Sequence, residues 1–265
     1  YESDKNFNAN LNELSPKLGI QWVINDHVLL RTAAFKKVKR ALTFEQTIEP
    51  TQVAGFNQLT DYVDMTVSKN YGAALDVRFN LQFFGGLEAL RRDTDVPLGQ
   101  LGSEFHEISN NQENFYKAYL YWLLSHNWAL SASWIYEKFE VVEDCKLCLF
   151  LYPAQLTTIS LPLNIQYFNP SGFFAGLDII YVNQDIKTLD FNSSNLLSSH
   201  NSFTLANAGL GYRLPKRWGI IALQANNLFD RKFYYQDYSF QTGTATVDPL
   251  YVPERTISAR LILNF

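Results

Sequence analysis

Apolar and polar residues alternate, one by one, in segment after segment of this chain. The same division recurs at 71–80, 115–122, 130–137 and 173–179. In the last segment it separates Ile257, Ala259, Leu261, Leu263 and Phe265 from Thr256, Ser258, Arg260 and Asn264. Because successive side chains of a strand point to opposite faces, each such segment predicts a β-strand with one apolar face.

The charged residues of these segments belong to the polar set. They are Asp76, Arg78, Lys117, Glu137, Asp178 and Arg260, and in less regular segments Arg31 and Glu88 fall on the same face. A Lys or Arg that faces lipid at the middle of a bilayer costs about 2 to 4 kcal/mol, whereas one that faces a wet lumen costs little. The sorting therefore predicts that one face of the strands meets lipid and the other meets water or protein.

Aromatic residues frame the short connections between strands. The pairs are Phe79 and Phe83, Trp122 and Trp128, Phe168 and Phe173, and Tyr212 and Trp218. Amphipathic rings prefer the headgroup level of a membrane, so these pairs indicate an aromatic girdle at one interface. A soluble β-sandwich, which also alternates, is the alternative, although nothing in it requires rings at every strand end.

The fold class predicted is all-β, an antiparallel up-and-down transmembrane β-barrel segment. We expect eleven strands, each long enough to cross a bilayer at a tilt, at about 14–24, 28–38, 66–79, 83–93, 114–124, 128–139, 155–168, 173–184, 202–214, 218–229 and 255–265. Long loops are expected at 39–65, 94–113, 140–154, 185–201 and 230–254, and the segment 51–57 has β character that predicts pairing above the membrane.

A barrel in lipid must close, and bacterial single-chain barrels normally have an even number of strands. An odd count predicts that this chain, one architectural unit over 1–265, is part of a larger barrel with further strands before Tyr1. One miscounted strand would instead allow closure with twelve.

Composition narrows the possible functions. The chain is 47% hydrophobic and 15% aromatic, yet it has no run of about 18 apolar residues that would make a spanning helix. Its net charge of −4 is dispersed, and no basic stripe is interleaved with aromatic residues, so nucleic acid is not an expected partner. The first ten residues are polar, so we expect a signal peptide that was removed or lay further upstream.

Other motifs favour loop roles. Cys145 and Cys148 form a C-x-x-C without the context of a redox or zinc site, which favours a small disulfide in an exposed loop. The four histidines have no metal-ligand spacing, and we expect neither a metal nor a cofactor. Ser198, Ser199, His200 and Asn201 could suggest a hydrolase, but adjacency in a polar loop does not make a catalytic group, so no catalytic residue is predicted.

The segment 225–238, followed by 253–256 and the final strand to Phe265, resembles the C-terminal end of TonB-dependent outer-membrane receptors. In that family an N-L-F-D-x-x-Y/F element stands at the top of the penultimate strand, and the last strand ends in an aromatic residue. The matching residues are Asn227, Leu228, Phe229, Asp230 and Phe233, with Phe265 at the terminus. More loosely, the segments 14–40 and 58–79 resemble a mid-barrel hairpin and the following strand of the same family.

The resemblance implies the C-terminal half of a 22-stranded barrel in the outer membrane of a Gram-negative bacterium. Such a receptor imports a metal chelate, vitamin or oligosaccharide with energy from TonB, and Phe265 would be read by the barrel-assembly machinery. The family's plug domain and TonB-contacting box have no counterpart in this chain, so TonB contact is expected through a plug outside it. A passive porin, or the membrane anchor of a secretion or surface-binding protein, is the alternative function.

Ligand contacts are expected on the extracellular rim. Aromatic rings of 233–240 could stack on a chelate or sugar, and arginine could pair with carboxylates. The alternative is that these rings belong to an outer girdle and pack loops together. The candidate ligand residues are Arg91, Arg92, Arg231, Tyr234, Tyr235 and Tyr238.

Overall fold

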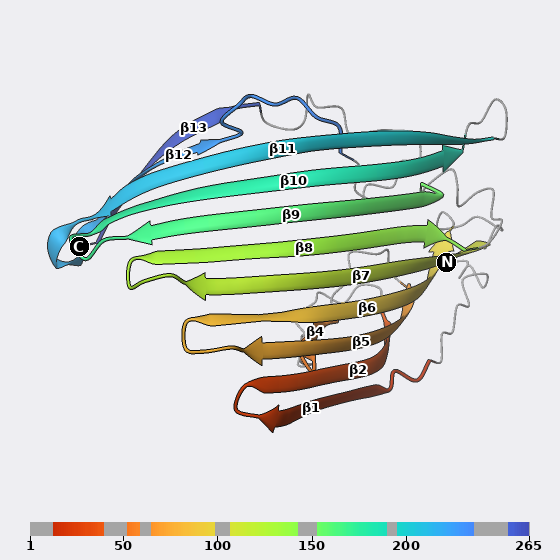
Figure 1. Cartoon of the computed structure of the whole chain (residues 1–265). Helices are drawn as coiled ribbons and strands as arrows, with labels where there is room; N and C mark the ends of the chain where they lie inside the picture. Colours follow the sequence, from red (N-terminus) through yellow and green to blue (C-terminus); the bar gives the residue numbers. More distant parts are fainter. Residues whose placement is uncertain are drawn as a thin grey trace, which may run out of the picture.

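The structure is a computed structural model that describes residues 13–39, 52–58, 65–98, 107–142, 153–189, 195–235 and 254–264. Eleven described strands form one antiparallel sheet in which each strand pairs with its neighbour in the chain (Figure 1). They are β1 (Lys17–Asn25), β2 (Val28–Val38), β5 (Val67–Arg78), β6 (Phe83–Leu98), β7 (Glu107–Leu123), β8 (Trp128–Val141), β9 (Gln155–Phe168), β10 (Phe173–Leu189), β11 (Leu196–Arg213), β12 (Gly219–Asn226) and β13 (Thr256–Leu263).

Three smaller elements accompany the sheet. The strands β3 (Gln52–Val53) and β4 (Phe56–Asn57) form a separate two-stranded hairpin, and a 3-10 turn, η1 (Pro215–Arg217), joins β11 to β12. Among the described residues, no helix has the length and hydrophobicity needed to cross a membrane. The consecutive antiparallel order is that of an up-and-down barrel wall, as the sequence predicted.

Several strands extend beyond their predicted ends. β6 and β7 occupy most of the predicted loop 94–113, and β10 and β11 occupy most of the predicted loop 185–201. The prediction was wrong there because alternation of apolar and polar residues fades where both faces leave lipid, while backbone pairing continues. Conversely, β12 ends at Asn226, earlier than predicted, because Asn227 takes a positive φ of 49° that leaves the extended region.

Asparagine side chains stabilise the short turns. Asn80 Oδ1 accepts hydrogen bonds from the backbone N–H groups of Gln82 and Phe83, each at 2.8 Å. Asn25 Oδ1 accepts from the N–H of His27, and Asn169 Oδ1 accepts from the N–H of Ser171. These contacts replace backbone hydrogen bonds that the reversal of the chain would otherwise leave unmade.

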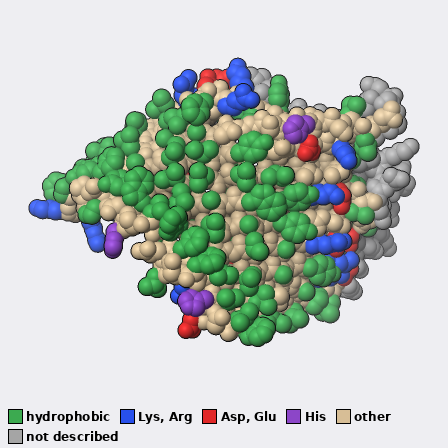
Figure 2. All heavy atoms as spheres, viewed as in Figure 1, with side chains coloured by type: hydrophobic (Ala, Val, Ile, Leu, Met, Phe, Trp, Pro, Cys, Tyr) green, Lys and Arg blue, Asp and Glu red, His purple; other side chains and the backbone are tan. Residues whose placement is uncertain are grey.

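The strand register separates the residues into two faces. Arg31 lies opposite Ala74, which lies opposite Glu88, which lies opposite Lys117, so these positions share one face. We call it the lumenal face, and following the register places all eight of the predicted inward charges on it. The other face, called outward, carries Leu75, Leu87, Leu161 and Ile257, which are partly or fully exposed. Figure 2 shows hydrophobic side chains spread over the strands on one side of the sheet, with charged groups mostly toward its margins.

The register also gives the strand tilt. One cross-strand row starts at Val28, the first residue of β2, and ends seven strands further on at Ala206, seven residues before the end of β11. The pairing therefore shifts by about one residue per strand. With about 3.3 Å per residue and 4.8 Å between strands, this shift corresponds to a tilt of about 35°. Membrane barrels tilt their strands by about 35 to 45°.

Two belts of aromatic residues follow this tilt on the outward face. The lower belt lies beside the short turns, where Phe79 stacks on Phe83 at 4.9 Å and Phe83 meets Trp122 edge-on at 5.9 Å. It continues through Trp128, Tyr167, Phe173 and Tyr212. Phe168, predicted as a girdle residue, falls on the lumenal face, and its neighbour Tyr167 takes its place.

The upper belt consists of Tyr71, Tyr116, Tyr136 and Tyr181, each six to eight residues further along its strand than the lower belt. At the observed tilt the two belts are about 20 Å apart. Between them, the outward positions of the described strands carry no Asp, Glu, Lys or Arg. An uncharged band of about 25 Å between two aromatic girdles is typical of a transmembrane barrel.

Leu163 and Asn164 on β9 provide a direct test of the two faces, because they are neighbours near the middle of this band and point in opposite directions. Leu163→Arg is expected to lower the free energy of unfolding in lipid vesicles by about 2 to 4 kcal/mol. Asn164→Arg, which adds the same group to the lumenal face beside Asp178, is expected to change it by less than about 1 kcal/mol. Equal losses from urea titrations of the two variants would contradict this assignment of faces.

Candidate functional site on the lumenal face

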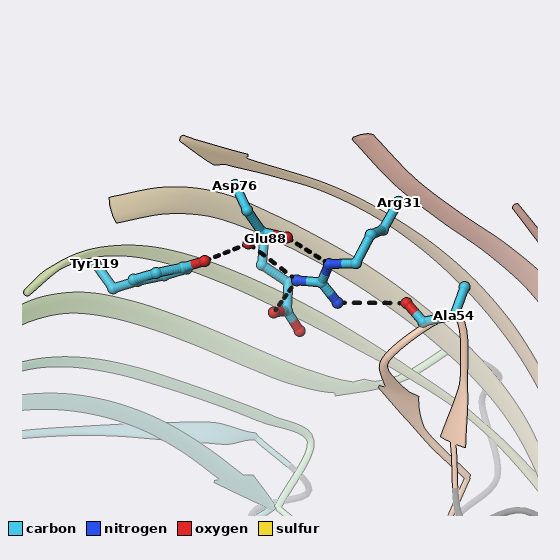
Figure 3. A network of polar contacts seen from close by, with 5 residues as sticks. All are labelled: Arg31, Ala54, Asp76, Glu88 and Tyr119. Carbon is cyan, nitrogen blue, oxygen red and sulfur yellow. Dashed lines mark hydrogen bonds and ion pairs between the residues drawn. The ribbon is translucent and has the colours of Figure 1, made fainter. Parts of the chain in front are cut away.

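An ion-pair network joins four neighbouring strands on the lumenal face (Figure 3). From β2, Arg31 donates hydrogen bonds from Nε and Nη2 to the two carboxylate oxygens of Asp76 on β5, at 2.6 and 3.2 Å. The hydroxyl of Tyr119 on β7 donates to the same carboxylate, and Glu88 on β6 lies 3.8 Å from Arg31 Nη2. A two-point contact between guanidinium and carboxylate fixes both side chains in orientation as well as position.

The network also holds the small hairpin β3–β4 against the wall. Arg31 Nη1 donates to the carbonyl oxygen of Ala54 at 3.4 Å, and its guanidinium lies 5.4 Å from the centre of the Phe56 ring. Only 1% of Phe56 is exposed, because the ring packs on Ala33, Phe35 and Ala74. The hairpin therefore has its own small hydrophobic core on the lumenal face.

Glycines in the wall make room for this hairpin. A Cβ atom on Gly72 of β5 would lie 2.6 Å from the Phe56 ring, and one on Gly19 of β1 would lie 2.9 Å from Val53. Strand pairing in 51–57 is confirmed, but its expected place above the membrane is wrong. Gly72 lies between the two aromatic belts, so the hairpin folds back into the lumen, where Phe56 leaves water by covering the small residues of the wall.

The neighbouring residues Arg91 and Arg92 separate to opposite faces. Arg92 is lumenal and only 12% exposed, and its guanidinium bonds Asn70 at 2.8 Å and Glu113 at 2.9 Å. Arg91 points outward beside Tyr71, is half exposed, and bonds Asp93 at 3.1 Å. The structure therefore does not bring these two candidate ligand residues together, since strand β6 continues through them.

The residues after β12, 231–235, also differ in exposure: some pack on the wall and others are exposed. Phe233 stacks on Phe203 at 4.2 Å, and Tyr235 meets Phe203 edge-on at 6.4 Å, so both rings pack on the wall. Arg231 and Tyr234 are exposed, and the carbonyl of Tyr234 accepts a hydrogen bond from Asn201. Tyr238, Cys145, Cys148 and Phe265 lie outside the described residues.

The matched N-L-F-D element forms a tight turn that connects three strands. The Asn227 side chain both accepts from the Arg231 N–H at 2.9 Å and donates to the Arg231 carbonyl at 3.0 Å, while its own N–H donates to Asn207 on β11. Asp230 Oδ1 accepts from the N–H of Arg255, next to β13. Asn and Asp suit these positions because each residue has a positive φ, 49° at Asn227 and 52° at Asp230.

The stretch Ser198 to Asn201, expected in a loop, is part of β11. His200 Nδ1 lies 2.8 Å from Asp185 Oδ1 on β10, and both side chains are mostly exposed. Alternation along β11 places Ser199 on the opposite face from His200. The run of polar residues therefore splits between the two sides of the sheet.

Comparisons with known proteins bear on the fold. No protein-family model and no curated protein matches the sequence. Among solved structures, the chain resembles a chain in "Structure of the FpvAI-pyocin S2 complex", with a TM-score of 0.55 and 12% identity over 88% of this chain and 32% of that chain. It is also similar to OmpT, an outer membrane protein of Vibrio cholerae, with a TM-score of 0.38 and 11% identity over 89% and 86% of the two chains. The first likeness supports the barrel-wall fold, and this chain spans about a third of the chain that it matches there.

Gly72→Val tests whether the hairpin depends on the space that Gly72 leaves. The added side chain would overlap the Phe56 ring, so residues 52–58 should detach and their amides should exchange with deuterium at least tenfold faster. Gly176→Val on β10 is the matched control, because a Cβ there meets nothing closer than 3.9 Å. Unchanged exchange in Gly72→Val would show that the hairpin is held by other contacts.

Asn227 is expected to stabilise the turn through both its side chain and its backbone conformation. Asn227→Gly keeps the positive φ but removes the contacts to Arg231, and should lower the free energy of unfolding by about 1 to 2 kcal/mol. Asn227→Ala adds backbone strain and should lower it by about 1 kcal/mol more. Denaturant titration of both variants measures the two effects, and an alanine variant as stable as the glycine variant would exclude the conformational contribution.

Proposed function

We propose that this chain is part of the barrel wall of a transporter in the outer membrane of a Gram-negative bacterium. The observation that carries the proposal is the complete sorting of charge by face: the outward positions between the aromatic belts are uncharged over the described strands, whereas the lumenal face is rich in ion pairs. Only a sheet that separates lipid from a polar interior needs this arrangement. A soluble sandwich would bury Leu161 and Leu75 against a second sheet, yet both are partly or fully exposed.

Within this class we propose a receptor that takes up a scarce, bulky nutrient, such as a metal chelate, a vitamin or an oligosaccharide, with energy from TonB. The N-L-F-D turn and the fold likeness to a chain of the FpvAI–pyocin S2 complex support this choice. The chain spans about a third of that chain. The plug domain, the contact with TonB and any further strands are therefore part of what we propose and not of what the structure describes. The barrel-assembly machinery would recognise Phe265.

The ligand would approach from the long-loop side and meet the upper lumenal wall. Arg92 projects into that region, and Arg231 and Tyr234 are exposed at the same end of the sheet. Guanidinium groups pair with carboxylates, and tyrosine rings stack on sugars or aromatic chelators. Tyr235 contributes to packing as well as to the rim, Tyr238 remains a sequence-based candidate, and Arg91 is better placed for the outward role discussed below.

Uptake in whole cells tests the proposal. Deletion of the gene should abolish accumulation of one member of a panel of radiolabelled ferric chelates, cobalamins and oligosaccharides, and the full-length gene should restore it. An uncoupler that dissipates the inner-membrane proton gradient should stop this accumulation, since TonB draws on that gradient. Flux that continues with the uncoupler would contradict energy coupling and favour a passive porin.

A further inference from the structure

Basic residues stand on the outward face immediately above the upper aromatic belt. On β5, Lys69 lies two residues from Tyr71 on the side of the long loops. On β8, Lys138 lies two residues from Tyr136 on the same side. Arg91 lies directly opposite Tyr71, and Lys36 lies directly opposite Lys69. Because residues two apart share a face, all four side chains point outward at one level. We call Lys36, Lys69, Arg91 and Lys138 the basic row.

The pair Lys36 and Lys69 is unfavourable within the chain itself. Like charges placed directly opposite each other on one face destabilise a sheet. Lys36 contacts Glu13, Arg91 contacts Asp93 and Lys138 contacts Glu140, but these ion pairs are partly or mostly exposed and contribute little. Lys69 also lies directly opposite Asp93 on β6, but that carboxylate bonds Arg91, and no ion pair joins Lys69 to any of the described residues. An anion from outside the chain would relieve the repulsion.

The level of the basic row indicates where that anion would come from. The tyrosines of the upper belt mark the boundary of the hydrocarbon, and the row begins about one residue pair above them, where lipid headgroups lie. Lys and Arg side chains can lie along the apolar surface while their charged ends reach the headgroups. In a membrane barrel the long loops are on the extracellular side, so the row would meet the outer leaflet.

We propose that the basic row binds the phosphate groups of the phosphorylated glycolipid that forms the outer leaflet. This inference rests on the proposed placement of the chain in the outer membrane. Lys69 and the outward-facing Arg91 would hold one phosphate between β5 and β6, with Lys36 beside them on β2 and Lys138 two strands further on. Arg91 therefore acts toward lipid, whereas its neighbour Arg92 faces the lumen.

Lipid titration of the full-length protein in detergent, followed by native mass spectrometry, tests the inference with diphosphorylated lipid A as the probe. Removal of one headgroup-level basic charge should weaken binding about fivefold, so Lys69→Gln should show this loss and Lys69→Gln/Arg91→Gln about a 20-fold loss. Lys69→Arg should bind as tightly as the unaltered protein. Lys187→Gln is the control, because Lys187 also points outward but lies six residues above Tyr181, and its effect should stay below twofold.

Equal lipid A affinity in the double variant and the unaltered protein would overturn the inference, and so would an equal loss in Lys187→Gln. Insertion into phosphatidylcholine vesicles, which carry no lipid A, separates this failure from failure of the proposed function. A protein that inserts but shows no dependence on the basic row would leave the membrane-wall proposal intact. A protein that inserts into no vesicle would contradict both the membrane-wall proposal and the lipid A proposal.

Discussion

The cost of placing a charge or an unpaired backbone group in hydrocarbon is the constraint on which the rest of this structure depends. Nine of the eleven strands, β2 and β5 to β12, pair with a neighbour on both edges, and between the aromatic belts the described strands keep their charged side chains on the lumenal face. The tilt of about 35° and the spacing of the two aromatic belts then follow from the register and from the thickness of the apolar band. A soluble fold would not need the combination of charges sorted by face, tilted strands and two aromatic belts.

Charged groups that face the lumen need partners there. Arg31 does so by bridging Asp76, Glu88 and the hairpin, and Arg92 does so with Asn70 and Glu113. These contacts join neighbouring and next-but-one strands, so they connect the strands of the wall as well as neutralise the charges. The same guanidinium that neutralises Asp76 also positions Phe56, which couples the wall to the element that partly fills the lumen.

Sequence reasoning recovered the strands and their faces because alternation is a local property. The set that contains Asp76, Lys117 and Asp178 could be recognised without knowing which strand pairs with which. The partners could not be recognised: the contact of Arg31 with Asp76 joins residues 45 apart, and that of Tyr119 with Asp76 joins residues 43 apart. The position of the hairpin also escaped prediction, since it depends on Gly19 and Gly72 leaving space on two other strands. Strand ends above the membrane were missed because alternation weakens where water contacts both faces.

The central claim is that the outward face touches hydrocarbon, and fluorescence of the native tryptophans in brominated lipid tests it most directly. Trp22, Trp122, Trp128 and Trp134, four of the five tryptophans, point outward. Reconstitution into vesicles whose acyl chains carry bromine should quench most of the emission relative to unbrominated vesicles, and aqueous iodide should quench little. Emission that is unaffected by bromine would contradict the account, because these rings would then lie away from the acyl chains.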